Sequence, residues 1–524
     1  MKGTSMRVSF VYLLGAALCV SGAFAAEGVP STILLPTTLG DHMVLQRDIP
    51  VPIRGVARPG ARVTVTMAGQ RVKAKADDTG NWQAVLAPMP AGGPHQVIIK
   101  TRGATAVLND VLVGDVWVCS GQSNMEWPMT NVVNTEAEIK NANHPNIRLF
   151  SVTKKVAGEP LAGCEGSWSA CTPETVKDFS AVGYFFGRAL QDTLDVPIGL
   201  IDSSWGGTPA EAWTSRASLE ANPDCAAILK RWDDALASYP TAQAEYEKAM
   251  ADWQKAAEAA KAAGQPEPRK PGQPLGPDHP HRASGLYNGM ISPLVPFAIK
   301  GAIWYQGESN AGRAYQYRSL FPTMITDWRK SWGDDFPFLY VQLANFMKTN
   351  SDANAGSAWA ELREAQLRTL GLKSTGMATI IDIGEAEDIH PRNKQDVGLR
   401  LAFSAFKVAY GYDWPDQGPM YASMKADGNA VRVKFTDTDG GLKNNNATGP
   451  LRGFAVAGED KVFHWADAKI EGDEVVLTSA NVAAPLAVRY GWGDNPVCDL
   501  YSSFNLPTSP FRTDDWPGVT VDQR

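Results

Sequence analysis

The sequence has no excess of positive charge. Lys and Arg number 49 against 56 Asp and Glu, which gives a formal net charge of −7 at pH 7 over 524 residues. A mildly acidic protein lacks the charge that attracts phosphate backbones and anionic lipids. We therefore expect neither nucleic acid nor an anionic membrane surface as a partner.

Residues that bind metal ions are scarce. The chain has six Cys and seven His, and no two Cys have the spacing of zinc ligands. His279 and His281, with Asp278, come nearest to a metal-binding cluster, but Pro280 separates the two histidines within a Pro-rich segment. We predict no metal site.

The sequence also lacks an apolar run long enough to cross a bilayer, which takes about 20 residues. Val8–Val20 is mostly apolar but shorter, and it lies between Lys2 and Arg7 on one side and Ala23-Phe24-Ala25 on the other. This is the pattern of a secretory signal peptide. We predict that residues 1–25 are removed, which takes the net charge from −7 to −9 because two cations are lost. The mature protein is then periplasmic or secreted, without a membrane anchor.

Five cysteines remain beyond the predicted signal peptide, so at least one has no partner within the chain. Cys164 and Cys171 close a short loop and could pair in an oxidising compartment. Two free thiols fit the sequence equally well, and both alternatives stay open.

Two segments have the alternating polar and apolar residues of β-strands. Between residues 27 and 108, Arg62–Met67 and Gln96–Lys100 alternate in this way, and we predict an N-terminal β-sandwich domain. Residues 413–524 contain further short strands such as Val431–Phe435, and we predict a C-terminal β-rich region. The sequence leaves open whether this region folds alone or completes a sandwich with the N-terminal segment.

Between these segments, residues 109–412 alternate short apolar strands with amphipathic helices. This order predicts an α/β domain with a parallel sheet and an active site at the carboxyl ends of its strands. A helical and then Pro-rich insertion is predicted over residues 217–280, either as a wall of the substrate groove or as a solvated excursion. The predicted strands are Val111–Val118, Ile198–Ser203, Gly301–Tyr305, Phe338–Leu343 and Met377–Ile383, and the predicted helices are Val182–Asp192, Tyr315–Trp332 and Ala358–Thr369.

Four polar clusters follow these strands, and the first contains a candidate nucleophile. Ser120-Gly121-Gln122-Ser123-Asn124 comes directly after the strand at 111–118. A serine at the carboxyl end of a buried strand is placed for nucleophilic attack, although Ser123 could instead cap the next helix. The motif lacks the second glycine of G-x-S-x-G, so the elbow of the α/β-hydrolases is not indicated.

The second and third clusters supply hydrogen-bond donors and a carboxylate. Trp205-Gly206-Gly207 follows the strand at 198–203. Paired glycines let backbone N–H groups approach a ligand, as an oxyanion site requires, while a tight turn is the simpler explanation. Gln306-Gly307-Glu308 follows the strand at 301–305 and offers an amide donor and a carboxylate.

The fourth cluster contains the histidine best placed to act as a base. His390 follows the strand at 377–383 in an acidic loop, and a neighbouring carboxylate would hold it in the required tautomer. The other six histidines lie in the β-regions, before a proline far from any strand end, or in the Pro-rich insertion. We predict that His390 is the base for Ser123.

Together, these clusters resemble the sialate O-acetylesterase-like family of the SGNH (GDSL-type) hydrolase superfamily. The Ser-Gly-Gln-Ser-Asn-Met and Trp-Tyr-Gln-Gly-Glu-Ser-Asn blocks are the most specific part of the match. The resemblance implies a three-layer α/β/α SGNH domain. The matching stretches are Gly114–Met129, Ile198–Ser215, Leu286–Asn310, Glu361–Gln366 and Asp388–Gln395.

The resemblance further implies a serine esterase that removes acetyl groups from carbohydrates. In such an enzyme Ser123 attacks the acetyl carbonyl and His390 takes its proton. A carboxylate orients His390, and Asp388 is the first candidate, with Glu387 second and Asp382 third.

The family also implies an oxyanion hole. It would use the backbone N–H of Ser123, the N–H of Gly206 or Gly207, and the side chain of Gln306. No metal or organic cofactor is implied, because a polarised serine needs neither. Residues expected to support the site or contact the substrate are Trp205, Glu308, Arg363 and Glu387.

The sequence does not fix the acetylated carbohydrate. Sixteen Trp and the acidic charge favour neutral plant-type glycans such as xyloglucan or xylan. Acetylated sialic acid is the alternative, since Arg363 or Arg392 could bind a carboxylate unless they pair with the acidic loop. A non-catalytic glycan-binding protein and a metal-dependent deacetylase are the competing classes, and the oligomeric state is open.

Overall fold

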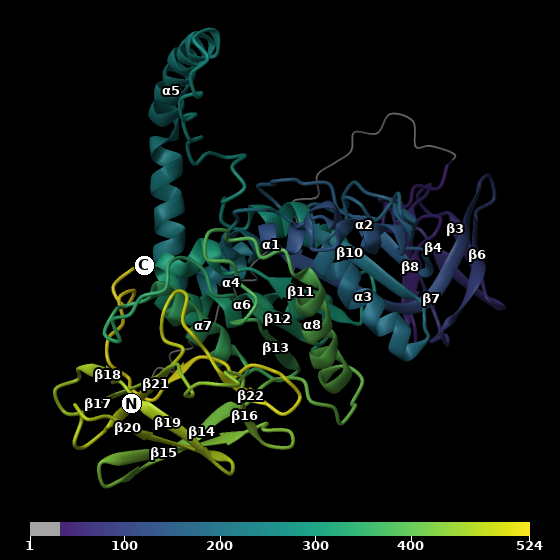
Figure 1. Ribbon diagram of the computed structural model, residues 1–524. Coiled ribbons are helices and arrows are strands. Elements are labelled where there is room, and N and C mark those ends of the chain that lie inside the picture. Colours follow the sequence, from purple (N-terminus) through teal and green to yellow (C-terminus); the bar gives the residue numbers. More distant parts are fainter. Residues whose placement is uncertain (1–31) are drawn as a thin grey trace, which may run out of the picture.

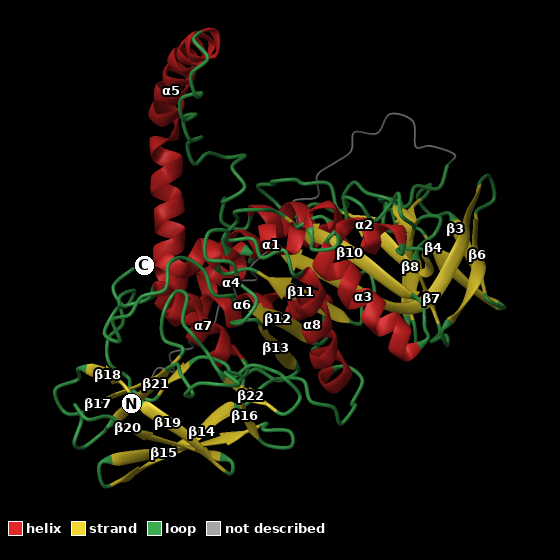
Figure 2. Ribbon diagram, in the orientation of Figure 1, coloured by secondary structure: helices red, strands yellow, loops and turns green. Residues whose placement is uncertain are grey.

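The computed structural model describes residues 32–524, so the signal peptide predicted over residues 1–25 lies outside the described residues. The architecture is mixed α/β. A large mixed sheet carries helices around its centre, and several small antiparallel sheets are arranged beside it (Figures 1 and 2).

One long strand, β7 (Thr105–Gly121), joins the N-terminal β-region to the α/β sheet. Its first part pairs antiparallel with β6 (Gly92–Lys100). From Asp115 onward it pairs parallel with β10 (Ile198–Ser204), and from Trp117 with β11 (Gly301–Tyr305). The domain boundary predicted between residues 108 and 109 therefore falls inside a continuous strand. The last eleven residues of β7 are all buried, which matches its apolar sequence.

The central sheet has the strand order β13-β12-β11-β7-β10-β8-β9. Its neighbours are parallel except for the final pair, β8 and β9. The sequence predicts the parallel strands at its centre but not β8, which begins with three polar or proline residues, or β9, which has only four residues. The remaining strands of this order are β8 (His144–Ser151), β9 (Trp168–Cys171), β12 (Phe338–Gln342) and β13 (Thr375–Thr379).

The helices of the central domain pack in pairs. Helix α3 (Ala181–Leu194) lies against α8 (Lys394–Val408), and α6 (Ala314–Trp332) lies against α7 (Ala358–Thr369). Ser180 caps α3 by accepting the N–H of Gly183, and Gly333 ends α6 in the left-handed conformation. The apolar periodicity locates α3, α6 and α7 to within a few residues. The shorter helices are α1 (Ser123–Glu126), α2 (Thr135–Lys140), α4 (Arg216–Ala221), η1 (Met129–Asn131), η2 (Ala210–Trp213), η3 (Pro223–Cys225), η4 (Tyr287–Ile291), η5 (Ser292–Leu294) and η6 (Glu308–Arg313).

The N-terminal β-region shares its core with the central domain. In β5 exposed and buried residues alternate along the whole strand. The inward-facing side chains, such as Val65 and Trp82, belong to the same hydrophobic cluster as Val118 of the central sheet. Its strands are β1 (Val44–Gln46), β2 (Val51–Val56), β3 (Arg62–Met67), β4 (Gln70–Lys75) and β5 (Asn81–Leu86), with β2 pairing β5, β3 pairing β4 and β6, and β1 pairing β7.

The C-terminal β-region has a hydrophobic core of its own, which includes Val433 and Leu477. It lies at the opposite end of the molecule from β3, β4 and β6 (Figure 1), so it does not complete the N-terminal sandwich. Its sheets are β14-β15-β20-β19, β18-β17-β21-β23 and β16-β22, formed by β14 (Met420–Asp427), β15 (Ala430–Thr436), β16 (Leu442–Asn444), β17 (Phe454–Ala457), β18 (Phe463–Trp465), β19 (Asp467–Glu471), β20 (Glu474–Thr478), β21 (Ala487–Tyr490), β22 (Leu500–Ser502) and β23 (Phe511–Arg512).

The predicted insertion at 217–280 contains a 37-residue helix, α5 (Ala226–Ala262). Figure 1 shows it standing away from the rest of the molecule, with the following segment running back toward its base. Its buried side chains, Ile228 and Trp232, both lie in its first two turns. Only the base of the insertion therefore packs against the domain.

The five cysteines in the described part of the chain are unpaired, so Cys164 and Cys171 are both thiols. Across residues 32–524, no helix is both long enough and apolar enough to cross a membrane.

Candidate active site

The carboxyl ends of β7, β10 and β11 meet at one edge of the sheet. In the register of these strands, Gly121 lies between Ser204 and Tyr305. Gly121 has a φ of +142°, and a Cβ there would lie 2.1 Å from the Tyr305 carbonyl oxygen. Only glycine fits this close approach. The turn that follows places Ser123 at the start of α1, beside the loops after β10 and β11.

The structure brings Ser123 and His390 into hydrogen-bond contact. Ser123 Oγ lies 2.9 Å from His390 Nε2, although the two residues are 267 positions apart. The other ring nitrogen, Nδ1, lies 3.3 Å from Asp388 Oδ1, which also accepts the backbone N–H of His390 at 2.9 Å. A serine, a histidine and a carboxylate in this order of contact are the arrangement of serine hydrolases.

The three carboxylates considered for His390 lie in different places. Asp388 contacts the ring. Asp382 instead receives two hydrogen bonds from Arg400, at 2.6 and 2.8 Å. Glu387 is exposed and has no hydrogen bond within the described residues. Geometry therefore favours Asp388 as the residue that orients His390.

Trp127 covers the face of the His390 ring. The two rings are stacked at a centroid distance of 4.8 Å and an interplanar angle of 15°. Burial lowers the pKa of His390 below its ordinary value of 6.5, and nearby Lys394 lowers it further, against the opposing effect of Asp388. A histidine that stays neutral near pH 7 can accept a proton from Ser123.

The N–H of Gly206 is already engaged. It donates a 2.6 Å hydrogen bond to Glu126 Oε2, and Glu126 also forms an ion pair with Lys154. A Cβ at Gly206 would lie 3.3 Å from the Cβ of Ser123, so this glycine is directly beside the serine. The Glu126 carboxylate therefore fixes the glycine turn next to the candidate nucleophile.

The Gln306 amide is also committed. Its Nε2 donates to Asn310 Oδ1 at 2.7 Å and to the Thr208 carbonyl at 3.3 Å, and its Oε1 accepts the hydroxyl of Tyr317 at 2.9 Å. The side chain is fully buried. The structure thus uses Gln306 to tie the loop after β10 to the loop after β11, and leaves it no spare donor for an oxyanion.

Two backbone donors of the predicted oxyanion hole remain available. Within residues 32–524, neither the N–H of Ser123 nor that of Gly207 has an acceptor. Gly207 has a φ of +75° and is exposed. These two N–H groups, on the turns after β7 and β10, fit an oxyanion better than Gly206 or Gln306 does.

A buried polar network lies behind the His390 loop, and sequence reasoning did not predict it. Asn124 Nδ2 donates to Glu308 Oε1 at 2.6 Å and to the Ile389 carbonyl at 3.0 Å. Its Oδ1 accepts a 2.5 Å hydrogen bond from Lys394 Nζ. Asn124 therefore links the serine turn to the backbone beside His390. Its position next to Ser123 in the motif was the only signal in the sequence.

Lys394 is the cation of this network and is fully buried. Its Nζ lies 5.6 Å from the ring centre of Trp127 and 5.4 Å from that of Tyr305. Burial lowers its pKa to about 7, partly offset by Glu308. Burial also raises the pKa of Glu308. The network thus holds a charge pair whose partners are both easier to neutralise than in water.

Arg363 and Trp205 were also predicted to support the site or contact the substrate. Arg363 is buried and donates to four backbone carbonyls, those of Leu343, Ala344, Gly493 and Asp494. None of these carbonyls belongs to the acidic loop around Glu385 to Asp388. Trp205 is half-buried at the site edge, with Lys154 Nζ 5.5 Å from its ring centre.

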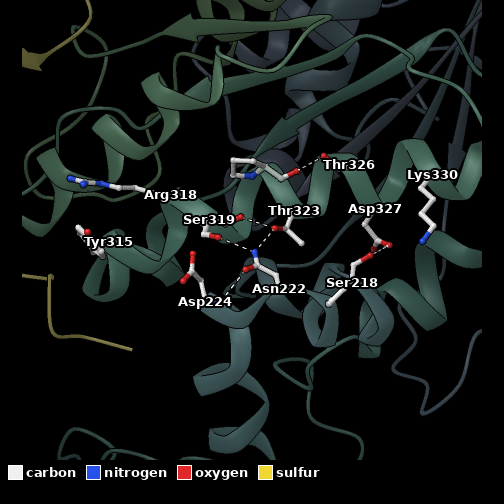
Figure 3. Close-up of a pocket in the computed structure, with 12 residues that line it drawn as sticks. Ser218, Asn222, Asp224, Tyr315, Arg318, Ser319, Thr323, Thr326, Asp327 and Lys330 are labelled. Carbon is white, nitrogen blue, oxygen red and sulfur yellow. Dashed lines mark hydrogen bonds between the residues drawn. The ribbon is translucent and has the colours of Figure 1, made fainter.

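A polar groove of about 690 Å³ lies between the base of the insertion and α6 (Figure 3), away from Ser123. Asn222 donates to Ser319 and Thr323 at 2.8 Å each, and Ser218 donates to Asp327 at 2.6 Å. These bonds fasten the insertion to α6. Among residues 32–524 there is no cluster of three or more His, Cys, Asp or Glu that could hold a metal ion.

The comparisons with known proteins agree with this geometry. Residues 113–263 and 279–406 match a family described as carbohydrate esterase, sialic acid-specific acetylesterase. The chain belongs to this family and is a carbohydrate O-acetylesterase, which confirms the resemblance predicted from its motifs.

Relatives match along almost the whole chain. Human sialate O-acetylesterase is 34% identical, with 92% of this chain and 93% of the human protein covered. The mouse sialate O-acetylesterase is 32% identical, with 90% and 93% covered. Among solved structures, a carbohydrate acetylesterase from Xanthomonas citri is 40% identical, with 92% of this chain and 100% of that chain covered and a TM-score of 0.78.

Proposed function

We propose that this protein uses Ser123 to remove acetyl groups from O-acetylated sialic acid. The observation that carries the proposal is the 2.9 Å contact between Ser123 Oγ and His390 Nε2 at the carboxyl edge of the sheet. The family of the chain supplies the reaction class, and the contact supplies a nucleophile with its base.

In the proposed mechanism, Ser123 Oγ attacks the acetyl carbonyl carbon while His390 Nε2 takes the hydroxyl proton. The tetrahedral intermediate collapses, the sugar oxygen leaves with the proton from His390, and an acetyl ester remains on Ser123. Water, deprotonated by His390, then attacks this ester and releases acetate. Asp388 keeps Nδ1 of His390 protonated throughout, so that Nε2 is the basic nitrogen.

The oxyanion of both steps would be held by the N–H groups of Ser123 and Gly207. Each such donor contributes about 3 kcal/mol to lowering the barrier. Gly206 takes a supporting role in this scheme, because its N–H donates to Glu126 and so orients the peptide that carries the Gly207 N–H. Gln306 likewise supports the turn, because its amide donates to the Thr208 carbonyl instead of contacting the oxyanion.

The choice of sialic acid departs from the preference for plant-type glycans suggested by composition. Tryptophan count and net charge are averages over the chain, and many Trp side chains, such as Trp117 and Trp304, are buried in the core. The mammalian relatives are named sialate O-acetylesterases and the matched family is described as sialic acid-specific. These comparisons support the sialate alternative over xyloglucan or xylan.

Two structural proposals accompany this function. We propose that the helices around the parallel strands form the three-layer α/β/α sandwich of SGNH hydrolases, with the pairs α3–α8 and α6–α7 as its outer layers. We also propose that the protein is exported, on the strength of the sequence at residues 1–25.

The test has two parts. A serine-directed fluorophosphonate should label the wild type and fail to label Ser123→Ala, which should also lose hydrolysis of an aryl acetate by many orders of magnitude. Acetate release should then be compared between acetylated sialic acid and acetylated xyloglucan or xylan at matched pH and salt. A Ser123→Ala variant that keeps a tenth of the activity would refute the nucleophile, and a higher kcat/KM on the plant glycans would refute the substrate. A non-catalytic glycan-binding protein would show neither labelling nor turnover.

A further inference from the structure

A second pocket, of about 250 Å³, begins at Pro209, just beyond the glycine turn of the active site. Its walls come from η2, from the base of α5 and from the segment that returns from the insertion. Pro209, two residues after Gly207, lines the pocket together with His281 of the returning segment. Gly206, the residue before Gly207, lies directly beside Ser123. The candidate nucleophile and the pocket therefore lie at opposite ends of one short segment, residues 206–209.

The pocket contains more positive than negative charge. Arg313 Nη2 lies 3.1 Å and Arg231 Nη2 lies 3.7 Å from the same oxygen of Glu211, Oε1. The other oxygen of Glu211 accepts a 2.8 Å hydrogen bond from Asn310. One carboxylate oxygen of Glu211 thus faces two guanidinium groups, while the other oxygen is bonded to Asn310. An additional anion would balance the second cation.

Both arginines also have unused donors. Arg231 Nη1 and Arg313 Nε are buried, and neither has an acceptor within residues 32–524. Arg231 Nη2 makes only a long, 3.4 Å contact with Gln316 besides its approach to Glu211. Buried N–H groups without acceptors cost free energy, so native proteins rarely leave them unsatisfied. A ligand with two carboxylate oxygens would supply the missing acceptors.

The electrostatics of Arg231 support the same conclusion. Burial lowers its pKa, and the charge of Arg313 lowers it further, with only Glu211 acting in the opposite direction. The two guanidinium groups therefore repel each other in the unliganded protein. An anion placed between them would turn this repulsion into attraction for both.

Apart from His281, the rest of the lining is apolar. Ile228 and Trp232 come from the first two turns of α5, and Leu275 comes from the returning segment. Such a pocket suits a compact ligand with one anionic group and a less polar face. An acidic sugar has this composition, whereas the acetylated residues of xylan and xyloglucan carry no carboxylate.

We infer that Arg231 and Arg313 form a carboxylate subsite, which holds the acid group of an acidic sugar while its acetyl ester lies against Ser123. This inference rests on the proposed function and makes it more specific. It also assigns a task to the insertion: the base of α5 supplies Arg231 and the apolar wall, so the insertion builds the substrate pocket from a segment outside the α/β core.

The experiment compares acetylated sialic acid with its C1 amide, which keeps the sugar and the ester but removes the negative charge. In the wild type, kcat/KM for the acid should exceed that for the amide by about tenfold or more, as expected for charge-assisted hydrogen bonds. In Arg231→Met this ratio should fall close to one, mainly through KM. Arg313→Lys keeps the positive charge but loses the planar pair of N–H donors, and it should give an intermediate acid-to-amide ratio. Arg216→Met, which removes an exposed arginine paired with Glu220, is the matched control and should leave the ratio unchanged.

An inhibition assay separates failure of the subsite from failure of the proposed substrate. Free sialic acid without an acetyl group should inhibit aryl acetate hydrolysis competitively, and Arg231→Met should weaken that inhibition about tenfold. If acetylated sialic acid is not hydrolysed but this inhibition depends on Arg231, the subsite holds and the substrate proposal fails. If the acid-to-amide ratio and the inhibition are both unaffected by Arg231→Met in a folded variant, the subsite is refuted.

Discussion

Lys394 Nζ donates a 2.5 Å hydrogen bond to Asn124 Oδ1, across 270 residues of sequence. The same asparagine holds the carbonyl of Ile389, next to His390, and contacts the Glu308 carboxylate. The hydrogen bonds of the lysine therefore reach the reacting groups only through other residues. It positions the loop that carries the base relative to the turn that carries the nucleophile.

Replacing Lys394 by Met should lower kcat about 100-fold, with little change in KM, because small displacements of a base cost orders of magnitude in rate. Lys394 also lowers the pKa of His390. Its loss should therefore raise that pKa and move the acidic limb of the kcat/KM profile to higher pH. Steady-state kinetics on an aryl acetate between pH 4 and pH 9 measure both effects.

Glu308→Gln is the matched control for the network, because its amide oxygen can still accept from Asn124 while the charge is removed. It should lose less activity than Lys394→Met. A Lys394→Met protein that is folded, fully active and unshifted in its pH profile would show that the network does not position His390.

Asp388→Asn should slow turnover far more than Glu387→Gln. The amide of the first variant can hold His390 with the wrong nitrogen protonated, and comparable substitutions cost about 10⁴-fold in kcat. Glu387 is exposed and has no contact with the ring, so its variant should stay close to wild type. The kcat values of the two variants on the same aryl acetate show which carboxylate orients His390. The reverse ranking would make Glu387 that carboxylate.

The acidic limb of kcat/KM should lie below pH 6.5. His390 must be neutral to accept the Ser123 proton, and burial, followed by Lys394, lowers its pKa from the ordinary value of 6.5. Activity should therefore be lost only as the pH falls through this lowered pKa, and regained as it rises again. A pH–rate profile with its acidic inflection above 6.5 would contradict the burial of His390 behind Trp127.

Glu126→Ala should lower kcat about tenfold or more, because Gly206 would lose the acceptor that orients the glycine turn and with it the Gly207 N–H. Glu126→Gln keeps an oxygen acceptor and should retain most of the activity. The comparison also tests the opposite possibility. A faster Glu126→Ala enzyme would mean that this carboxylate occupies an oxyanion donor and has to be displaced by the substrate.

The sequence predicts which residues of this site lie at strand ends, but not how their side chains and N–H groups are oriented. Ser123 and His390 follow apolar strands, and strand ends in parallel sheets converge, so their proximity could be expected from patterning alone. The sequence named candidate oxyanion donors, but which of them are left without an acceptor could not be predicted. That depends on the engagement of the Gly206 N–H by Glu126, 80 positions away, and on how Gln306 is oriented among its neighbours.

The fold shows the same division. The apolar runs locate the central strands, but β8 begins with His144, Pro145 and Asn146, and β9 has only four residues, so neither stands out from the loops. The boundary at residue 108 was misleading for a related reason. The pattern of polar and apolar residues changes there because β7 passes from a half-exposed sheet into a fully buried one. The strand itself continues.

Arg363 was predicted to contact substrate or the acidic loop, and its actual role leads to a stability prediction. Its guanidinium joins the carbonyls of Leu343 and Ala344 in the central domain to those of Gly493 and Asp494 in the C-terminal region. Arg363→Met should leave these four acceptors without their donor, in a place that water does not reach. We expect a loss of about 3 kcal/mol or more in the free energy of unfolding.

Urea unfolding followed by tryptophan fluorescence measures this loss, with Arg392→Met as the control. Arg392 is exposed and makes one long side-chain hydrogen bond, 3.3 Å to the Asn131 carbonyl, so its removal should change the unfolding free energy by less than about 0.5 kcal/mol. The ratio of acetylated sialic acid to aryl acetate turnover should be the same in folded Arg363→Met as in wild type, because the guanidinium bonds only backbone carbonyls. A stable Arg363→Met protein that loses selectively on sialic acid would instead return Arg363 to the substrate site.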